Sequence, residues 1–164
     1  MIKIVFCDDN EDLKNKELIN AFDTVFNNTE NELFYLCDNN TIYKKSGKQW
    51  DEISSDDLDY LSIFKNSYIF LDTRWNPPRD NIRDAIVLWL EDNYGVYKKA
   101  IVYSVYGRAD ADKFVKDLLN KKIDVLNESH FMINDISYEQ YAHFEKSLRT
   151  VKKIDIDLGG NNNV

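Results

Sequence analysis

The chain has 164 residues and carries 29 acidic against 21 basic side chains, which gives a formal net charge of −8. Hydrophobic residues make up 43% of the chain and charged residues 30%, as in an ordinary globular domain, and no apolar run approaches the roughly 20 residues that span a bilayer. The acidic balance argues against a general nucleic-acid binder, and the short N-terminal apolar stretch argues against a signal peptide, so a cytoplasmic protein is expected.

Five short apolar runs are predicted to form buried strands. Each is rich in β-branched or aromatic residues and nearly continuous in hydrophobicity, as expected of parallel strands that are covered on both faces. In chain order these runs are residues 2–7, 33–37, 68–71, 100–103 and, with the weakest pattern, 131–133.

Helical periodicity fills most of the chain between these runs, at residues 11–27, 80–93, 110–120 and 137–153. Strands that alternate with helices predict crossover connections, and therefore a mostly parallel sheet between layers of helices. The connection at residues 38–65 is long and predicts an enlarged second crossover, with a solvated turn near Gly47 and a helix over residues 55–64.

Polar side chains follow several of the predicted strands. Asp8 and Asp9 follow the first strand, Asp72 follows the third and Ser104 follows the fourth. The carboxyl ends of parallel strands share one edge of the sheet, so these four residues are expected to converge there. Three carboxylates repel one another unless a cation neutralises them, and an oxygen-rich site of this kind suits Mg²⁺ beside an aspartate that accepts a phosphoryl group.

Four segments resemble the receiver domain of bacterial two-component response regulators. IVFCDDNEDL at residues 4–13 resembles the family's first strand and its acidic pair, and FLDTRWNP at residues 70–77 resembles the strand with the phosphorylated aspartate. IVYSVYG at residues 101–107 resembles the fourth strand with its Ser or Thr, and ISYEQY at residues 136–141 resembles the start of the final helix.

The resemblance implies a five-stranded, doubly wound, flavodoxin-like sandwich over residues 1–154, with residues 155–164 as a flexible tail. It also implies that Asp8 and Asp9 bind Mg²⁺, that Asp72 is both a metal ligand and the phosphoryl acceptor, that the carbonyl of Arg74 completes the protein ligands, and that Ser104 hydrogen-bonds the phosphoryl group. A histidine kinase or phosphotransfer protein would then supply the phosphoryl group, and the altered surface would bind an output protein that the sequence does not identify.

Two departures from the family pattern leave other functions open. Asn134 and Asp135 occupy the position where the family has a lysine, and Val105 stands where the family favours Ala or Gly. A pseudo-receiver that binds its partner without phosphorylation is therefore an alternative. A Mg²⁺-dependent phosphohydrolase on the same kind of sheet is a lesser one, because the chain offers no second acid/base pair.

Overall fold

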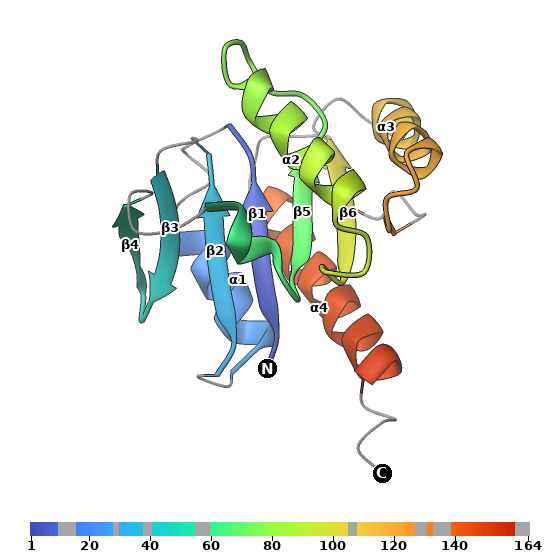
Figure 1. The fold of residues 1–164 in the computed structure, drawn as a ribbon. Coiled ribbons are helices and arrows are strands. Elements are labelled where there is room, and N and C mark those ends of the chain that lie inside the picture. The colour runs from blue at the N-terminus through green and yellow to red at the C-terminus, as the bar shows by residue number, and fades with distance from the viewer. Residues whose placement is uncertain are drawn as a thin grey trace.

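The structure is a computed structural model that describes residues 1–9, 16–27, 30–37, 41–54, 60–104, 108–126, 131–132 and 139–159. A central sheet with helices around it makes up this part of the chain (Figure 1). The strands are β1 (Lys3–Cys7), β2 (Glu32–Leu36), β3 (Thr41–Ser46), β4 (Gln49–Ser54), β5 (Tyr68–Asp72), β6 (Lys99–Ser104) and β7 (Phe131–Met132). The α-helices are α1 (Lys16–Val25), α2 (Asp80–Asp92), α3 (Arg108–Asn120) and α4 (Glu139–Gly159), and a 3-10 helix covers Tyr60–Phe64.

The seven strands lie in the order β4-β3-β2-β1-β5-β6-β7. All neighbouring pairs from β2 to β7 are parallel, whereas β3 and β4 pair antiparallel to their neighbours. The parallel part, β2-β1-β5-β6-β7, confirms the predicted mostly parallel sheet and is compatible with a flavodoxin-like fold. β2 lies beside β1 on one side of the β1–β5 pair, and β6 lies beside β5 on the other side, so the strand order reverses between β1 and β5.

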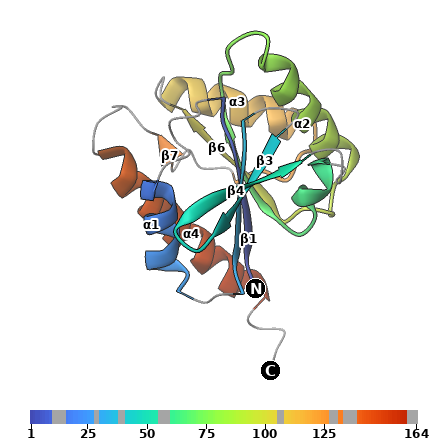
Figure 2. The ribbon, with the colours of Figure 1, turned by 90° about the vertical axis from the view of Figure 1, so that its left-hand side faces the viewer.

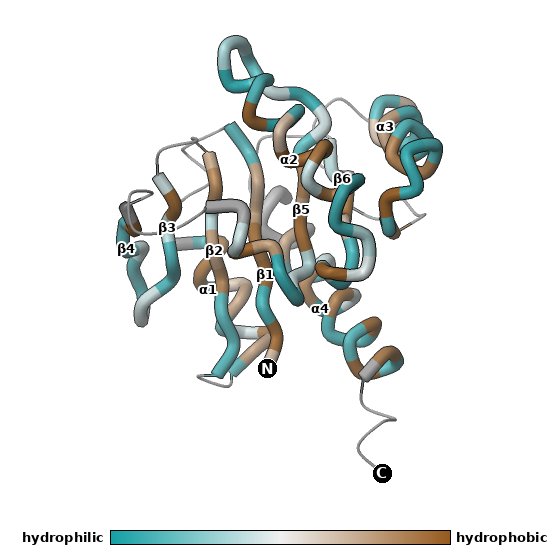
Figure 3. Tube along the Cα trace, in the orientation of Figure 1, coloured by the Kyte–Doolittle hydropathy of each residue, from teal (hydrophilic) through white to brown (hydrophobic). Residues whose placement is uncertain are grey.

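Helices cover both faces of the sheet, as Figure 2 shows with the sheet seen nearly edge-on. On one face, Phe6 of β1 stacks on Phe70 of β5 with ring centroids 4.4 Å apart and meets Phe144 of α4 edge-on at 5.5 Å. On the other face, α2 and α3 bury apolar residues such as Ile86 and Val115 against the sheet. Hydrophobic residues are accordingly concentrated on the central strands (Figure 3).

The sheet is larger than predicted, because residues 41–54 form a β-hairpin within the long second connection. β3 and β4 extend the edge at β2, and Lys45 and Lys48 bind Asp23 of α1 at 3.0 and 2.6 Å. The predicted turn near Gly47 is confirmed as the two-residue turn of this hairpin. Of the helix predicted at 55–64, residues 60–64 form the 3-10 helix, and the rest lies outside the described residues.

The last helix also extends further than predicted. α4 continues to Gly159, so the proposed tail at 155–164 begins inside a helix. Asp155 accepts hydrogen bonds from the Tyr68 hydroxyl at 2.8 Å and from Lys98 Nζ at 2.9 Å, and these bonds attach the end of α4 to the sheet. The helix thus continues past the residue at which the tail was predicted to begin.

The Gly47→Ala variant is expected to lower the free energy of unfolding by about 1 kcal/mol. Gly47 has a φ of 61°, which is costly for a residue with a Cβ, and an added Cβ would meet no atom within 4 Å. Gly47→Asn should cost less, because asparagine adopts this conformation more easily. Urea unfolding of both variants checks the prediction, and equal losses would contradict the conformational explanation.

Candidate metal centre

Three carboxylates meet where β1 and β5 end, which confirms the predicted convergence of these side chains. Asp8 and Asp9 directly follow β1, and Asp72 is the last residue of the neighbouring strand β5. Cys7 pairs with Leu71 in this parallel register, so the residues that follow them lie side by side. One oxygen of each of the three carboxylates lies within 4.8 Å of the others. The cluster lies at the point where the strand order reverses, which is where open α/β sheets bind ligands.

Two of the three carboxylates are buried, and one of their oxygen atoms has no hydrogen-bond partner. Asp8 is 3% exposed and Asp72 is 6% exposed, and the Oδ1 atom of Asp72 is buried without a hydrogen-bond partner. Burial, followed by the charges of Asp8 and Asp9, raises the pKa of Asp72 to about 9, although a backbone hydrogen bond from Arg74 partly opposes this shift. Without a cation, Asp72 therefore carries a proton at neutral pH.

The donor set fits a hard divalent cation. All three side chains offer carboxylate oxygens, which Mg²⁺ prefers, and Asp9 is only partly buried, so the cluster has access to solvent. A cation between the carboxylates would both neutralise their repulsion and satisfy the orphaned Oδ1 of Asp72. The cluster can thus hold a metal ion. Its oxygen-only ligands suit a hard cation better than a metal that prefers nitrogen or sulfur ligands.

Neighbouring groups hold the two N-terminal carboxylates in place. The hydroxyl of Tyr103, a fully buried residue on β6, donates a short hydrogen bond to Asp8 Oδ2. The backbone N–H of Asn76 donates to Asp9 Oδ2 at 2.5 Å, and Arg79 Nη1 donates to the Asp9 carbonyl at 2.9 Å. The loop after β5 is therefore tied to the loop after β1 across the cluster. Sequence reasoning assigned neither Tyr103 nor Arg79 to the site.

Trp75 is buried beside the cluster. Its indole Nε1–H donates to the Asp72 carbonyl at 3.2 Å, and the side chain is 4% exposed. The indole N–H is therefore hydrogen-bonded to the backbone of Asp72, the candidate phosphoryl acceptor. An NMR signal from this group should report directly on changes at Asp72.

Ser104 lies at the same edge of the sheet, but its hydroxyl is bonded to a residue that sequence reasoning did not assign to the site. Ser104 Oγ donates to Asp110 Oδ2 at 2.9 Å, and Asp110 also accepts bonds from Thr73 and from the side chain of Arg74. The only signal for Asp110 in the sequence is an acidic residue in the first turn of a predicted helix, a common capping preference. The role of the Arg74 carbonyl as a metal ligand and the role of Ser104 toward a phosphoryl group stay predictions.

The two departures from the family pattern cannot be located. Val105, Asn134 and Asp135 all lie outside the described residues, so the predicted absence of a lysine beside the acceptor remains a prediction from the sequence. Within the described part of the chain, the charges that shift the pKa of Asp72 come from Asp8 and Asp9, and both raise it. The surroundings of Asp72 in the described part of the chain are thus strongly acidic.

Comparisons with known proteins identified no relative, so a function must be proposed from the geometry of the site. No protein-family model, curated protein or solved structure matched the chain. Within the described ranges, none of the helices combines the length and the apolar character needed to cross a membrane.

Proposed function

We propose that this protein is a receiver-like signalling domain in which Asp72 accepts a phosphoryl group with Mg²⁺ held by Asp8, Asp9 and Asp72. The buried Oδ1 atom of Asp72, which has no hydrogen-bond partner and lies in a three-carboxylate cluster, carries this proposal. The strand order β2-β1-β5-β6-β7, with helices on both faces, supports the doubly wound, flavodoxin-like arrangement that a receiver needs.

The proposed reaction uses Asp72 as a nucleophile. One carboxylate oxygen forms a bond to phosphorus while the bond between phosphorus and the donor's leaving atom breaks, which yields an acyl phosphate on Asp72. This step needs the ionised carboxylate, whereas burial and the neighbouring charges keep Asp72 protonated when no cation is bound. When bound, Mg²⁺ would supply the positive charge that ionises Asp72 and neutralises the phosphoryl oxygens.

The remaining roles follow from position in the site. The carbonyl of Arg74, two residues after the acceptor, would complete the protein ligands of the metal. Ser104, at the end of the neighbouring strand β6, would donate its hydroxyl to the phosphoryl group. The phosphoryl donor in the cell would be a histidine kinase or phosphotransfer protein, and the changed surface near α3 would bind an output protein in the cytoplasm.

The pseudo-receiver alternative is supported by one contact. The Ser104 hydroxyl, which was predicted to donate to a phosphoryl group, already donates a hydrogen bond to Asp110 when no phosphoryl group is present. A domain that always keeps this hydrogen bond and is never phosphorylated would bind its partners constitutively. Phosphorylation of the folded protein distinguishes the two functions.

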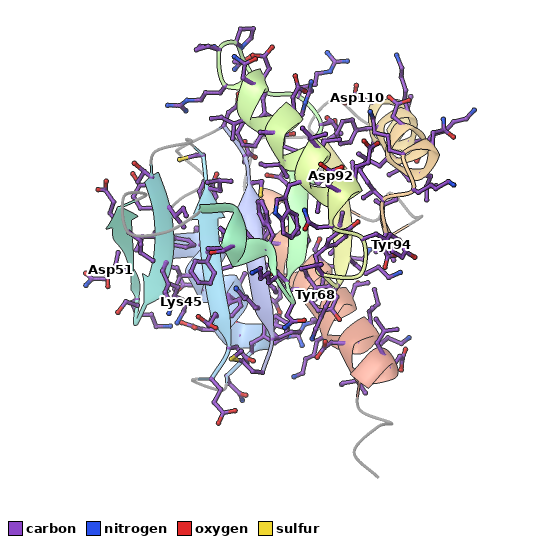
Figure 4. All side chains as sticks on the ribbon, in the orientation of Figure 1. Lys45, Asp51, Tyr68, Asp92, Tyr94 and Asp110 are labelled. Atoms are coloured by element: carbon purple, nitrogen blue, oxygen red, sulfur yellow. The ribbon has the colours of Figure 1, made fainter. Side chains whose placement is uncertain are left out.

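Incubation with acetyl phosphate and Mg²⁺ is expected to add one phosphoryl group to the wild-type protein, and Asp72→Asn is expected to abolish the adduct completely. Intact mass spectrometry measures both, with EDTA in place of Mg²⁺ as a second condition. Asp51→Asn is the matched control, because Asp51 is an exposed carboxylate on β4 at the far edge of the sheet from α3 (Figure 4). A folded wild-type protein without any adduct would favour the pseudo-receiver, and an adduct in Asp72→Asn would place the acceptor elsewhere.

A further inference from the structure

The carboxylate of Asp110 gathers the polar side chains next to the candidate acceptor. Its Oδ2 atom accepts hydrogen bonds from Thr73 Oγ1 at 2.6 Å and from Ser104 Oγ at 2.9 Å. Its Oδ1 atom accepts from Arg74 Nε at 3.1 Å and from Arg74 Nη2 at 2.9 Å. Asp110 lies in the first turn of α3 (Figure 4). Two hydroxyls and one guanidinium therefore converge on a single anionic group.

These three donors lie beside Asp72. Thr73 and Arg74 are the two residues that follow it, and Ser104 ends the strand that pairs with β5. The Thr73 backbone N–H donates to the Tyr103 carbonyl at 3.2 Å, and Arg83 Nη1 donates to the Thr73 carbonyl at 2.8 Å, so the start of this loop is fixed in place. An anionic group attached to Asp72 would lie at the same edge of the sheet as these donors, where β5 and β6 end.

The chemistry of the donors fits phosphoryl oxygens. A guanidinium with two hydroxyls binds carboxylate and phosphoryl oxygens in the same way, through charge-assisted hydrogen bonds. Partial burial alone would raise the pKa of Asp110, but hydrogen bonds from Thr73, Arg74 and Ser104 outweigh burial and hold it below its usual value. The Asp110 carboxylate thus occupies all three donors, with an ion pair to Arg74 at 2.9 Å.

We propose that Asp110 is an internal competitor for the phosphoryl group, which must displace the Asp110 carboxylate from Ser104, Thr73 and Arg74 when it forms on Asp72. The proposal rests on phosphoryl acceptance by Asp72. It also assigns Arg74 as the cation that binds the phosphoryl group once Asp110 releases it. When Asp110 is displaced, the first turn of α3 loses its hydrogen bonds to the loop after β5. Phosphorylation of Asp72 would in this way change the protein surface at α3.

The test compares acetyl phosphate labelling of the wild-type protein with Asp110→Ala and Asp110→Asn, all with Mg²⁺. Loss of the competing carboxylate is expected to raise the initial rate of adduct formation about tenfold in Asp110→Ala, which is the effect of one charge-assisted hydrogen bond. Asp110→Asn, which keeps an acceptor oxygen but loses the charge, should show a smaller gain. Asp112→Ala is the matched control, because Asp112 is an exposed carboxylate two residues further along the same helix.

Two further measurements separate competition from a structural effect. The double variant Ser104→Ala/Asp110→Ala should lose most of the increase in labelling rate, because it lacks the Ser104 hydroxyl that the loss of Asp110 makes available. A Mg²⁺ titration followed by the Trp75 indole N–H signal should give the same affinity in Asp110→Ala as in the wild type, since Asp110 lies outside the carboxylate cluster. Thermal unfolding confirms that each variant is folded, and Asp110→Asn serves if Asp110→Ala is not.

The outcomes distinguish this proposal from the function on which it rests. Labelling of the wild type without faster labelling of the Asp110 variants overturns the competition and leaves phosphoryl acceptance intact. Labelling of an Asp110 variant but not of the wild type supports the competition strongly and identifies Asp110 as the reason for an inactive wild type. Labelling of neither overturns both proposals, and the Mg²⁺ titration then shows whether the metal site alone remains.

Discussion

In EDTA at pH 8, the Asp72→Asn variant is expected to be more stable than the wild-type protein, and the difference should shrink as the pH falls. Burial and the charges of Asp8 and Asp9 raise the pKa of Asp72 to about 9, whereas in the unfolded chain it is about 3.9. Between these two values the folded protein keeps a proton that the unfolded chain has lost. The free energy of unfolding therefore falls as pH rises, by at most about 1.4 kcal/mol per pH unit.

Between pH 5 and pH 8 this loss amounts to as much as about 4 kcal/mol in the wild type, and Asp72→Asn removes it because an amide does not titrate in this range. Urea unfolding at several pH values measures the difference between the two proteins, in which the contributions of other titrating groups cancel. Asp51→Asn should keep the wild-type slope. Parallel pH profiles for the wild type and Asp72→Asn would mean that Asp72 is ionised without a metal.

Addition of Mg²⁺ at pH 8 is expected to restore the lost stability. A ligand that binds only the folded state at about 100 times its Kd raises the free energy of unfolding by about 2.7 kcal/mol. The gain should be smaller at pH 6, because the proton on Asp72 competes with the cation. Thermal unfolding with and without Mg²⁺ measures this gain at each pH.

Asp9→Asn is the most informative variant for this second experiment. Asp9 is the least buried of the three cluster residues, so its replacement perturbs the fold least while it removes one ligand. The Mg²⁺-dependent gain should fall sharply in Asp9→Asn and remain unchanged in Asp51→Asn. An equal gain in all three proteins would indicate a nonspecific effect of the cation on an acidic protein.

The parallel sheet and the carboxylate cluster were predictable for the same physical reason. A strand covered on both faces must be apolar along its length, and the first polar residue after it marks the edge of the sheet. Asp8, Asp9 and Asp72 all occupy such positions, and parallel pairing then brings them together. Local sequence was sufficient here because the site depends on where strands end.

The hairpin and the role of Asp110 were not predictable in this way. In β3, only Ile42 among six residues is fully buried, so the strand has no continuous apolar run to identify it. The contact between Ser104 and Asp110 depends on the path by which the chain leaves β6 and enters α3. That path is a tertiary feature, and an acidic residue at a helix start is equally consistent with a simple capping role.

The hairpin also changes how copies of this protein meet at high concentration. Among the strands that the structure describes, β4 is the outer one on this side, and unpaired backbone groups on an edge strand can recruit a strand from another molecule. Asp51 and Glu52 are consecutive exposed acids on β4, so two copies approaching through these strands would bring four negative charges together. The repulsion between these charges would oppose edge-to-edge pairing of two copies through β4.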